Sequence, residues 1–163
     1  MKINYPNVEK IIIELASQNK TISFAESCTG GRLAAAFTSI NGASAVFYGS
    51  VVSYSNEIKE AWLGVRKETL KKHGAVSSQC VDEMLQGIVN MTTTIKSDYA
   101  IAISGIAGPT GGTKDKPVGT VYIGLLTPSK QEVFECLFHG EREEVQEQST
   151  AFAIKKLEEV LEI

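Results

Sequence analysis

Apolar residues recur every three or four positions in several stretches of the chain, and this spacing predicts amphipathic helices. In the first stretch Val8, Ile11 and Leu15 fall on one face, and in a later one Val81 and Leu85 do the same. With the residue types that start and end helices, the pattern predicts helices at 7–20, 29–40, 57–63 and 67–72, one from Ser77 and one from Glu141. Asn7 and Asn56 are the expected N-caps of two of them.

Stretches rich in β-branched and aromatic residues lie between these helices. They predict strands at 21–25, 45–54, 99–104, 118–126 and 132–138. The segment Tyr99–Ser104 is almost continuously apolar, as expected for a strand covered on both faces, and Thr127–Lys130 suggests a hairpin turn. This order predicts an α/β fold: a three-layer α/β/α sandwich around a mixed, mostly parallel sheet, in one domain over residues 1–163.

Composition narrows the class of protein. The chain has 163 residues, 43% hydrophobic and 21% charged, with a net charge of -3, so a nucleic-acid partner is not expected. It contains neither an apolar run that could span a bilayer nor a signal-peptide pattern, so we expect a cytoplasmic protein without a membrane partner. Cys28, Cys80 and Cys136 are scattered, which argues against a disulfide framework or a bound metal.

The candidate chemistry begins where the first strand turns into a helix, at Ser27-Cys28-Thr29-Gly30-Gly31. Free backbone N–H groups at a helix N-terminus favour anions and developing negative charge. Ser27 is a possible nucleophile, and Cys28 is another, because a thiol at a helix N-terminus can have a depressed pKa. The alternative is a purely structural turn, with Thr29 as the helix cap and the glycines allowing close packing.

A serine nucleophile needs a base. His73 lies in a predicted helix C-terminus and His139 in a strand-to-helix turn, so neither is well placed. Lys59 follows the second predicted strand and could serve if its pKa were lowered by burial; otherwise it is an exposed helix lysine. Tyr54 could relay a proton, or could be a tyrosine at the sheet edge.

A second candidate segment is the glycine-rich stretch after the strand 99–104. Glycine at the carboxyl end of a buried strand lets the backbone approach a ligand, and backbone N–H groups there suit a phosphate. A mobile connector is the alternative. Its candidate residues are Ser104, Gly105, Ala107, Gly108, Gly111 and Gly112. Arg142, at the start of the last predicted helix, could add a bidentate contact to a phosphate or could be a solvated charge.

Several motifs in this order resemble the CinA C-terminal (competence-damage) family over nearly the whole chain. They are Ala25–Gly31, Tyr54–Lys59 with Leu63–Val65, Leu70–Ser77, Ser104–Pro109, Lys116–Thr120 and Gly140–Arg142. The resemblance implies a nicotinamide-nucleotide amidohydrolase that converts nicotinamide mononucleotide to nicotinate mononucleotide and ammonia. It also implies that the chain corresponds to the C-terminal domain of longer members, whose N-terminal domain resembles molybdopterin-binding domains.

Matched motif by motif, the resemblance implies Ser27 as nucleophile, Lys59 as general base and Tyr54 as an assisting group. It implies a small-molecule nucleotide substrate, no cofactor and no metal, and a homo-oligomer. We further expect the Thr29, Gly30 and Gly31 amides to stabilise the oxyanion, and Gly105–Gly112 to cradle the ribose phosphate. The chain departs from the family at Gln146, where members often carry Arg. A catalytically silent nucleotide-binding or regulatory module is the alternative function.

Overall fold

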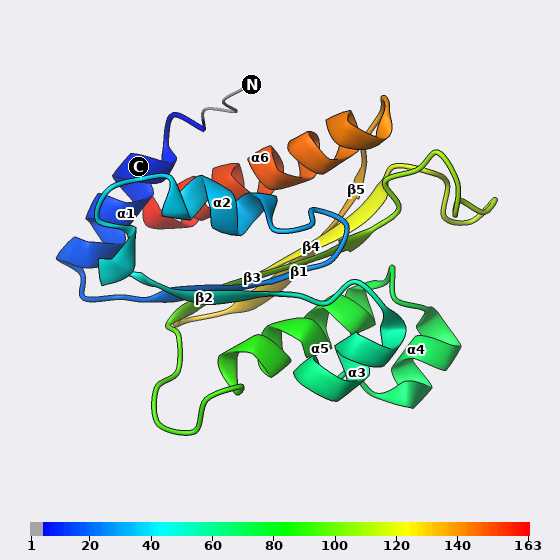
Figure 1. Ribbon diagram of the computed structural model, residues 1–163, viewed down its shortest axis with the longest axis horizontal. Helices are drawn as coiled ribbons and strands as arrows, with labels where there is room; N and C mark the ends of the chain where they lie inside the picture. The colour runs from blue at the N-terminus through cyan, green and yellow to red at the C-terminus, as the bar shows by residue number, and fades with distance from the viewer. Residues whose placement is uncertain (1–4) are drawn as a thin grey trace.

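A five-stranded sheet forms the centre of the computed structural model, which describes residues 5–163 (Figure 1). Its strands are β1 (Ile22–Glu26), β2 (Phe47–Val52), β3 (Tyr99–Gly105), β4 (Thr120–Leu126) and β5 (Gln131–Leu137), in the spatial order β2-β1-β3-β4-β5. The helices are α1 (Val8–Ser17), α2 (Arg32–Thr38), α3 (Asn56–Leu63), α4 (Lys67–His73), α5 (Ser78–Val89) and α6 (Arg142–Leu161), with a 3-10 turn at Ala43–Ala45.

The sheet is mixed, as the sequence predicts, but parallel pairings do not dominate it. Strand β1 pairs in parallel with both β2 and β3, whereas the β3–β4 and β4–β5 pairs are antiparallel. The expected hairpin turn is present, with the Thr127 N–H donating to the Lys130 carbonyl oxygen at 2.8 Å. A tight turn forces its strands antiparallel, and β3 and β4 are joined without the crossover helix that parallel strands require.

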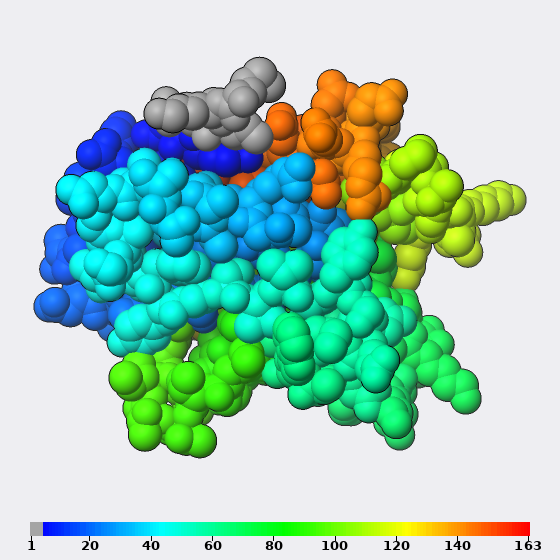
Figure 2. Space-filling model, viewed as in Figure 1, coloured from blue at the N-terminus to red at the C-terminus, as the bar shows by residue number. Residues whose placement is uncertain are grey.

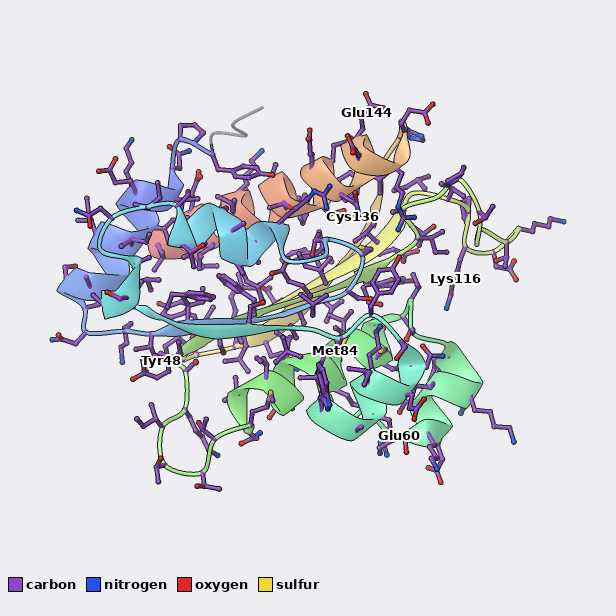
Figure 3. All side chains as sticks on the ribbon, in the orientation of Figure 1. Tyr48, Glu60, Met84, Lys116, Cys136 and Glu144 are labelled. Atoms are coloured by element: carbon purple, nitrogen blue, oxygen red, sulfur yellow. The ribbon has the colours of Figure 1, made fainter. Side chains whose placement is uncertain are left out.

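Helices cover both faces of the sheet, which gives the expected three layers (Figure 1). Helices α1, α2 and α6 lie on one face, and α3, α4 and α5 on the other. Each face has its own apolar cluster. The first is built around Phe24, Ile101 and Leu157, and the second around Met84, Leu85 and Ala102 (Met84 is labelled in Figure 3).

Local details move several predicted boundaries. The predicted helix 29–40 begins only at Arg32, because Gly31 precedes it with a φ of 95°, in the left-handed region. The N-cap of α3 is Ser55 instead of Asn56, and its hydroxyl accepts the Ile58 N–H. Asn7 does occupy the N-cap position of α1, although its side chain makes no capping bond.

The carboxyl ends of β2, β1 and β3 meet at one edge of the sheet, as parallel pairing requires. The loop between β3 and β4 stands out beyond this edge (Figures 1 and 2). Lys116 ties that loop to α4, since its Nζ atom donates to the His73 carbonyl oxygen at 2.6 Å (Figure 3). Within residues 5–163, no helix is long and apolar enough to cross a membrane.

Candidate active site

A cavity of about 320 Å³ opens at the carboxyl ends of the parallel strands β1, β2 and β3. Such crevices at the carboxyl ends of parallel strands are where α/β proteins bind ligands. Its walls are formed by Ser27, Cys28, Tyr54, Asn56, Lys59, Ala75, Val76, Ser104, Gly105, Ile106, Ala107, Gly108, Thr110, Gly111 and Arg142. The cavity therefore brings together the predicted nucleophile, base and glycine-rich loop.

Ser27 follows directly after β1 and is held at the strand end. Its N–H donates to the Ile103 carbonyl oxygen of β3 at 3.0 Å. Its side chain lines the cavity, although only 6% of the residue surface is exposed. The backbone of Ser27 is thus held by the sheet, and its side chain is presented to the cavity.

Lys59 is the residue that the hydroxyl meets. Its Nζ atom lies 2.9 Å from the Ser27 Oγ atom and donates to the Ser53 carbonyl oxygen at 2.6 Å. Lys59 lies on α3, which starts just after β2 and turns the side chain back toward the strand ends. With 1% of its surface exposed, Lys59 is not the solvated helix lysine of the alternative interpretation.

Burial also changes the chemistry of this amine. The loss of solvent lowers the pKa of Lys59 below its ordinary value, because the ammonium form is the one that burial penalises. None of the ion pairs formed within residues 5–163 involves Lys59. A neutral amine beside a hydroxyl can accept its proton, which is what a general base must do.

Cys28 lines the same cavity, but its pKa is shifted upward, whereas that of Lys59 is shifted downward. Burial raises the pKa of its thiol to about 12, so the thiol stays protonated near neutral pH. This contradicts the interpretation of Cys28 as a low-pKa nucleophile, which requires an environment that favours the thiolate. The two histidines also lie away from the site: neither is part of the cavity wall.

Tyr54 and Arg142 meet at the mouth of the cavity. Arg142 donates through Nη2 to the Tyr54 hydroxyl at 2.7 Å and through Nη1 to the Gly108 carbonyl oxygen at 2.6 Å. Tyr54 is 61% exposed. Its hydroxyl is therefore paired with the guanidinium at the rim, and its expected assistance to Ser27 stays a prediction.

The glycine-rich loop is explained partly by packing. A Cβ atom on Gly105 would lie 2.6 Å from Val121 and 2.9 Å from the Thr120 carbonyl oxygen, and one on Gly108 would overlap the Val118 side chain. Both residues also line the cavity, whereas Gly112 packs against Val118 and does not. Close packing, of Gly105 on β4 and of Gly108 and Gly112 on Val118 just before β4, thus explains the absence of side chains at three of the positions predicted to bind phosphate.

One of the three expected oxyanion donors, the Gly30 amide, already has a partner in the turn. Thr29, Gly30 and Gly31 do not belong to the cavity wall. The Gly30 N–H already donates to the Ser27 carbonyl oxygen at 3.0 Å, and the Thr29 hydroxyl donates to Glu26 instead of capping α2. The Gly30 N–H and the Thr29 hydroxyl therefore stabilise the turn itself, and the oxyanion role of the Thr29 and Gly31 amides stays a prediction.

Sequence reasoning missed three supporting groups. The Ser53 carbonyl oxygen binds Lys59, Asn56 lines the cavity, and Gln146 donates to the Cys28 carbonyl oxygen at 2.9 Å. The sequence could have indicated the Gln146 contact, because Gln146 lies four positions after Arg142 and therefore on the same face of the helix. Gln146 is 8% exposed, and through this contact it supports the turn at residues 27–31, the nucleophile turn.

Fold and site together define an α/β protein with a buried serine–lysine pair in a cavity at the carboxyl ends of parallel strands. The chain belongs to the CinA C-terminal domain family, whose model matches residues 5–161. It is 46% identical to a CinA-like protein of Thermotoga neapolitana and 50% identical to one of Endomicrobium trichonymphae, covering 95% and 88% of this chain. It spans only 37% and 33% of the length of those two relatives.

Solved structures share the fold over nearly their full length. A competence-damaged protein (CinA) superfamily protein from Klebsiella pneumoniae superposes with a TM-score of 0.89 at 39% identity, with 95% of each chain covered. A competence or damage-inducible protein from Enterobacter asburiae gives a TM-score of 0.90 at 33% identity, with 98% of this chain and 99% of that chain covered.

Proposed function

We propose that the protein is an amidohydrolase that converts nicotinamide mononucleotide to nicotinate mononucleotide and ammonia. The observation that carries the proposal is the 2.9 Å separation of the Ser27 Oγ and Lys59 Nζ atoms, with the amine buried and its pKa lowered. A lysine within hydrogen-bond reach of a serine, with a pKa lowered toward the neutral form, supports the assignment of a nucleophile–base pair.

In the reaction, Lys59 takes the Ser27 hydroxyl proton while the oxygen attacks the carboxamide carbon. The tetrahedral intermediate collapses as Lys59 returns the proton to the leaving nitrogen, which departs as ammonia. Water then attacks the acyl-serine ester as Lys59 accepts its proton, and the acyl–oxygen bond breaks as Lys59 returns that proton to the Ser27 oxygen, which releases nicotinate mononucleotide. The 2.6 Å contact with the Ser53 carbonyl oxygen keeps Nζ in place and stabilises the transient ammonium.

The oxyanion requires N–H donors at the cavity. Because the Gly30 N–H is occupied, we assign one donor to the backbone of Cys28, which follows the nucleophile and lines the cavity. The residue after the nucleophile supplies such a donor in other α/β hydrolases. The Cys28 carbonyl group is held by Gln146, which restrains the peptide on its other side.

The size of the cavity suggests how the substrate lies. At about 320 Å³ it is near the lower limit of small-molecule pockets, enough for the pyridine carboxamide. The ribose phosphate would then extend to the mouth, where Arg142 is the cation on the cavity wall that can bind a phosphate through two N–H groups. Substrate would exchange the Arg142 contacts with Tyr54 and Gly108 for contacts with phosphate.

Ammonia release from nicotinamide mononucleotide tests the proposal. We expect Ser27→Ala to lose turnover and Cys28→Ala to retain it, because the Cys28 thiol is protonated and only its backbone takes part. Activity that survives in Ser27→Ala but not in Cys28→Ala would refute the assignment. If nicotinamide mononucleotide raises the Tm of the wild type without any turnover, the silent binding module is the correct function.

A further inference from the structure

Glu26 is a buried acidic residue that the proposed reaction does not use. It is the last residue of β1, directly before Ser27, and is fully buried at 0% exposure. Burial of a carboxylate is costly unless its oxygens are hydrogen-bonded or paired with a cation. Among the ion pairs of the described chain, none includes Glu26, so other groups must hold it.

Each oxygen of the Glu26 carboxylate accepts two hydrogen bonds. Oε1 accepts from the Thr29 hydroxyl at 2.8 Å and from the Leu33 N–H at 3.0 Å. Oε2 accepts from the Ala34 N–H at 3.1 Å and from the Ser50 hydroxyl at 3.0 Å. Four donors and no acceptor suit an ionised carboxylate. They come from the nucleophile turn, the first turn of α2 and the edge strand β2.

This arrangement changes the role of α2. The Leu33 and Ala34 amides belong to the first helical turn, where N–H groups lack intrahelical partners. They point at the protein's own carboxylate, so the N-terminus of α2 does not serve a substrate anion. It serves instead to hold the end of β1.

The main chain of Glu26 also reaches the base. Its carbonyl oxygen accepts the Ser53 N–H at 2.8 Å and the Ser53 hydroxyl at 3.3 Å. The Ser53 carbonyl oxygen in turn accepts from Lys59 Nζ at 2.6 Å. Glu26 is therefore bonded to Ser27 through the chain and linked to Lys59 through one residue.

We propose that Glu26 is a positioning residue whose carboxylate fixes the turn that presents Ser27 to Lys59. It does not touch substrate, since it is absent from the cavity wall. The inference rests on the proposed function only in taking Ser27 as the nucleophile. Displacing a reacting group by about 1 Å can reduce a rate about 100-fold, so a small shift of this turn has a large effect.

The test variant is Glu26→Gln, which preserves shape but replaces one acceptor oxygen with an NH₂ donor. Covalent labelling of Ser27 by a fluorophosphonate, followed by intact mass, reports the reactivity of the dyad without any nucleotide. We expect labelling and kcat to fall by about 30-fold or more, with KM changed less than about threefold, because the turn is displaced but the cavity mouth is intact.

Asp98→Asn is the matched control. Asp98 accepts the Thr21 N–H at 2.9 Å and the Thr21 hydroxyl at 3.2 Å, at the opposite end of β1. We expect it to lower Tm while leaving labelling within about twofold of wild type, since these bonds lie far from the turn. Wild-type labelling in folded Glu26→Gln, or equal slowing in Asp98→Asn at a matched loss of Tm, would overturn the proposal.

If Glu26→Gln does not fold, Ser50→Ala tests the same proposal, because Ser50 donates to the Glu26 carboxylate. It removes one of the four donors, and we expect labelling to slow several-fold with KM unchanged; labelling at the wild-type rate would count against the role of Glu26. If the wild type labels at Ser27 in a Lys59-dependent manner but does not hydrolyse nicotinamide mononucleotide, the proposed substrate fails while Glu26 is still judged by labelling.

Discussion

The charge state of one buried amine couples activity to pH. Burial lowers the pKa of Lys59, so the neutral form becomes available below the ordinary lysine value of 10.5. We expect kcat/KM to rise with pH along an acid limb that reports this group, and then to level off. A profile for ammonia release without an acid limb at any pH at which the protein stays folded would contradict the assignment of Lys59 as base.

The same shift makes Lys59 a source of instability. Folded protein binds fewer protons at this site than unfolded protein between the lowered pKa and 10.5, so stability rises with pH across that window. The penalty is full below the folded-state pKa and is gone above the unfolded value. We therefore expect the Tm advantage of Lys59→Met over wild type to shrink as pH rises from 7 to 10, measured by scanning calorimetry; an advantage that grows would refute this.

Arg142 is expected to control substrate affinity more than chemistry. Arg142→Ala should raise KM for nicotinamide mononucleotide about tenfold or more, with a smaller effect on kcat, because a bidentate phosphate contact is lost. Arg66→Ala is the control, since Arg66 pairs with Glu83 on the surface and is not part of the cavity wall. A fall in kcat with KM unchanged would place Arg142 in the chemical step instead.

Among single residues, the sequence identified the candidate site side chains but not the groups that hold them in position. Ser27, Lys59 and Arg142, which were singled out from their motifs, line one cavity, and their roles stay predictions. The Ser53 carbonyl oxygen was not foreseen, because backbone acceptors are the same at every position. The role of the Glu26 carboxylate was not foreseen because its donors come from separate segments of the chain. Their importance depends on how β1, β2 and α3 approach one another, which no local pattern encodes.

Among the elements, the contact between α3 and α5 fixes the position of the base. A Cβ atom on Gly87 of α5 would overlap the Leu63 carbonyl oxygen at the end of α3. We expect Gly87→Ala to push α3 away, lower Tm and reduce kcat by about tenfold, as a shift of the Lys59 amine requires. Gly49→Ala is the control, because a Cβ atom there meets nothing within 4 Å. Equal activity of the two variants would argue against this account.

Element types were predictable where periodicity was strong, and connections were predictable where turn residues were explicit. The buried strand Tyr99–Gly105 and the hairpin between β4 and β5 followed from their residues. The proportion of parallel strand pairs could not be predicted from these residues, because it depends on the direction in which β4 pairs with β3. The close contact of Gly87 with α3 was also not predictable, because a glycine within a helical pattern does not indicate which backbone packs against it.

In the molecule as a whole, two separate apolar layers hold the sheet. Phe24 is fully buried and contacts Phe37 and Phe47, with ring centroids 4.9 and 5.1 Å away. We expect Phe24→Ala to reduce the free energy of unfolding by about 3–5 kcal/mol in urea titrations, from lost burial and the cavity that remains. Ile13→Ala, at a side chain 62% exposed, should change it by less than about 0.5 kcal/mol. Equal effects would contradict the assignment of this core.

Chemistry and recognition come from different parts of the chain. Glu26, Ser27 and Lys59 all belong to the unit from β1 through α3, whereas Gly108 and Arg142 come from segments after β3. The second group can therefore be exchanged without changing the residues of the first. On the proposed function, grafting the β3–β4 loop and the first turn of α6 from a relative should exchange nucleotide preference in a chimera that retains its serine–lysine reactivity.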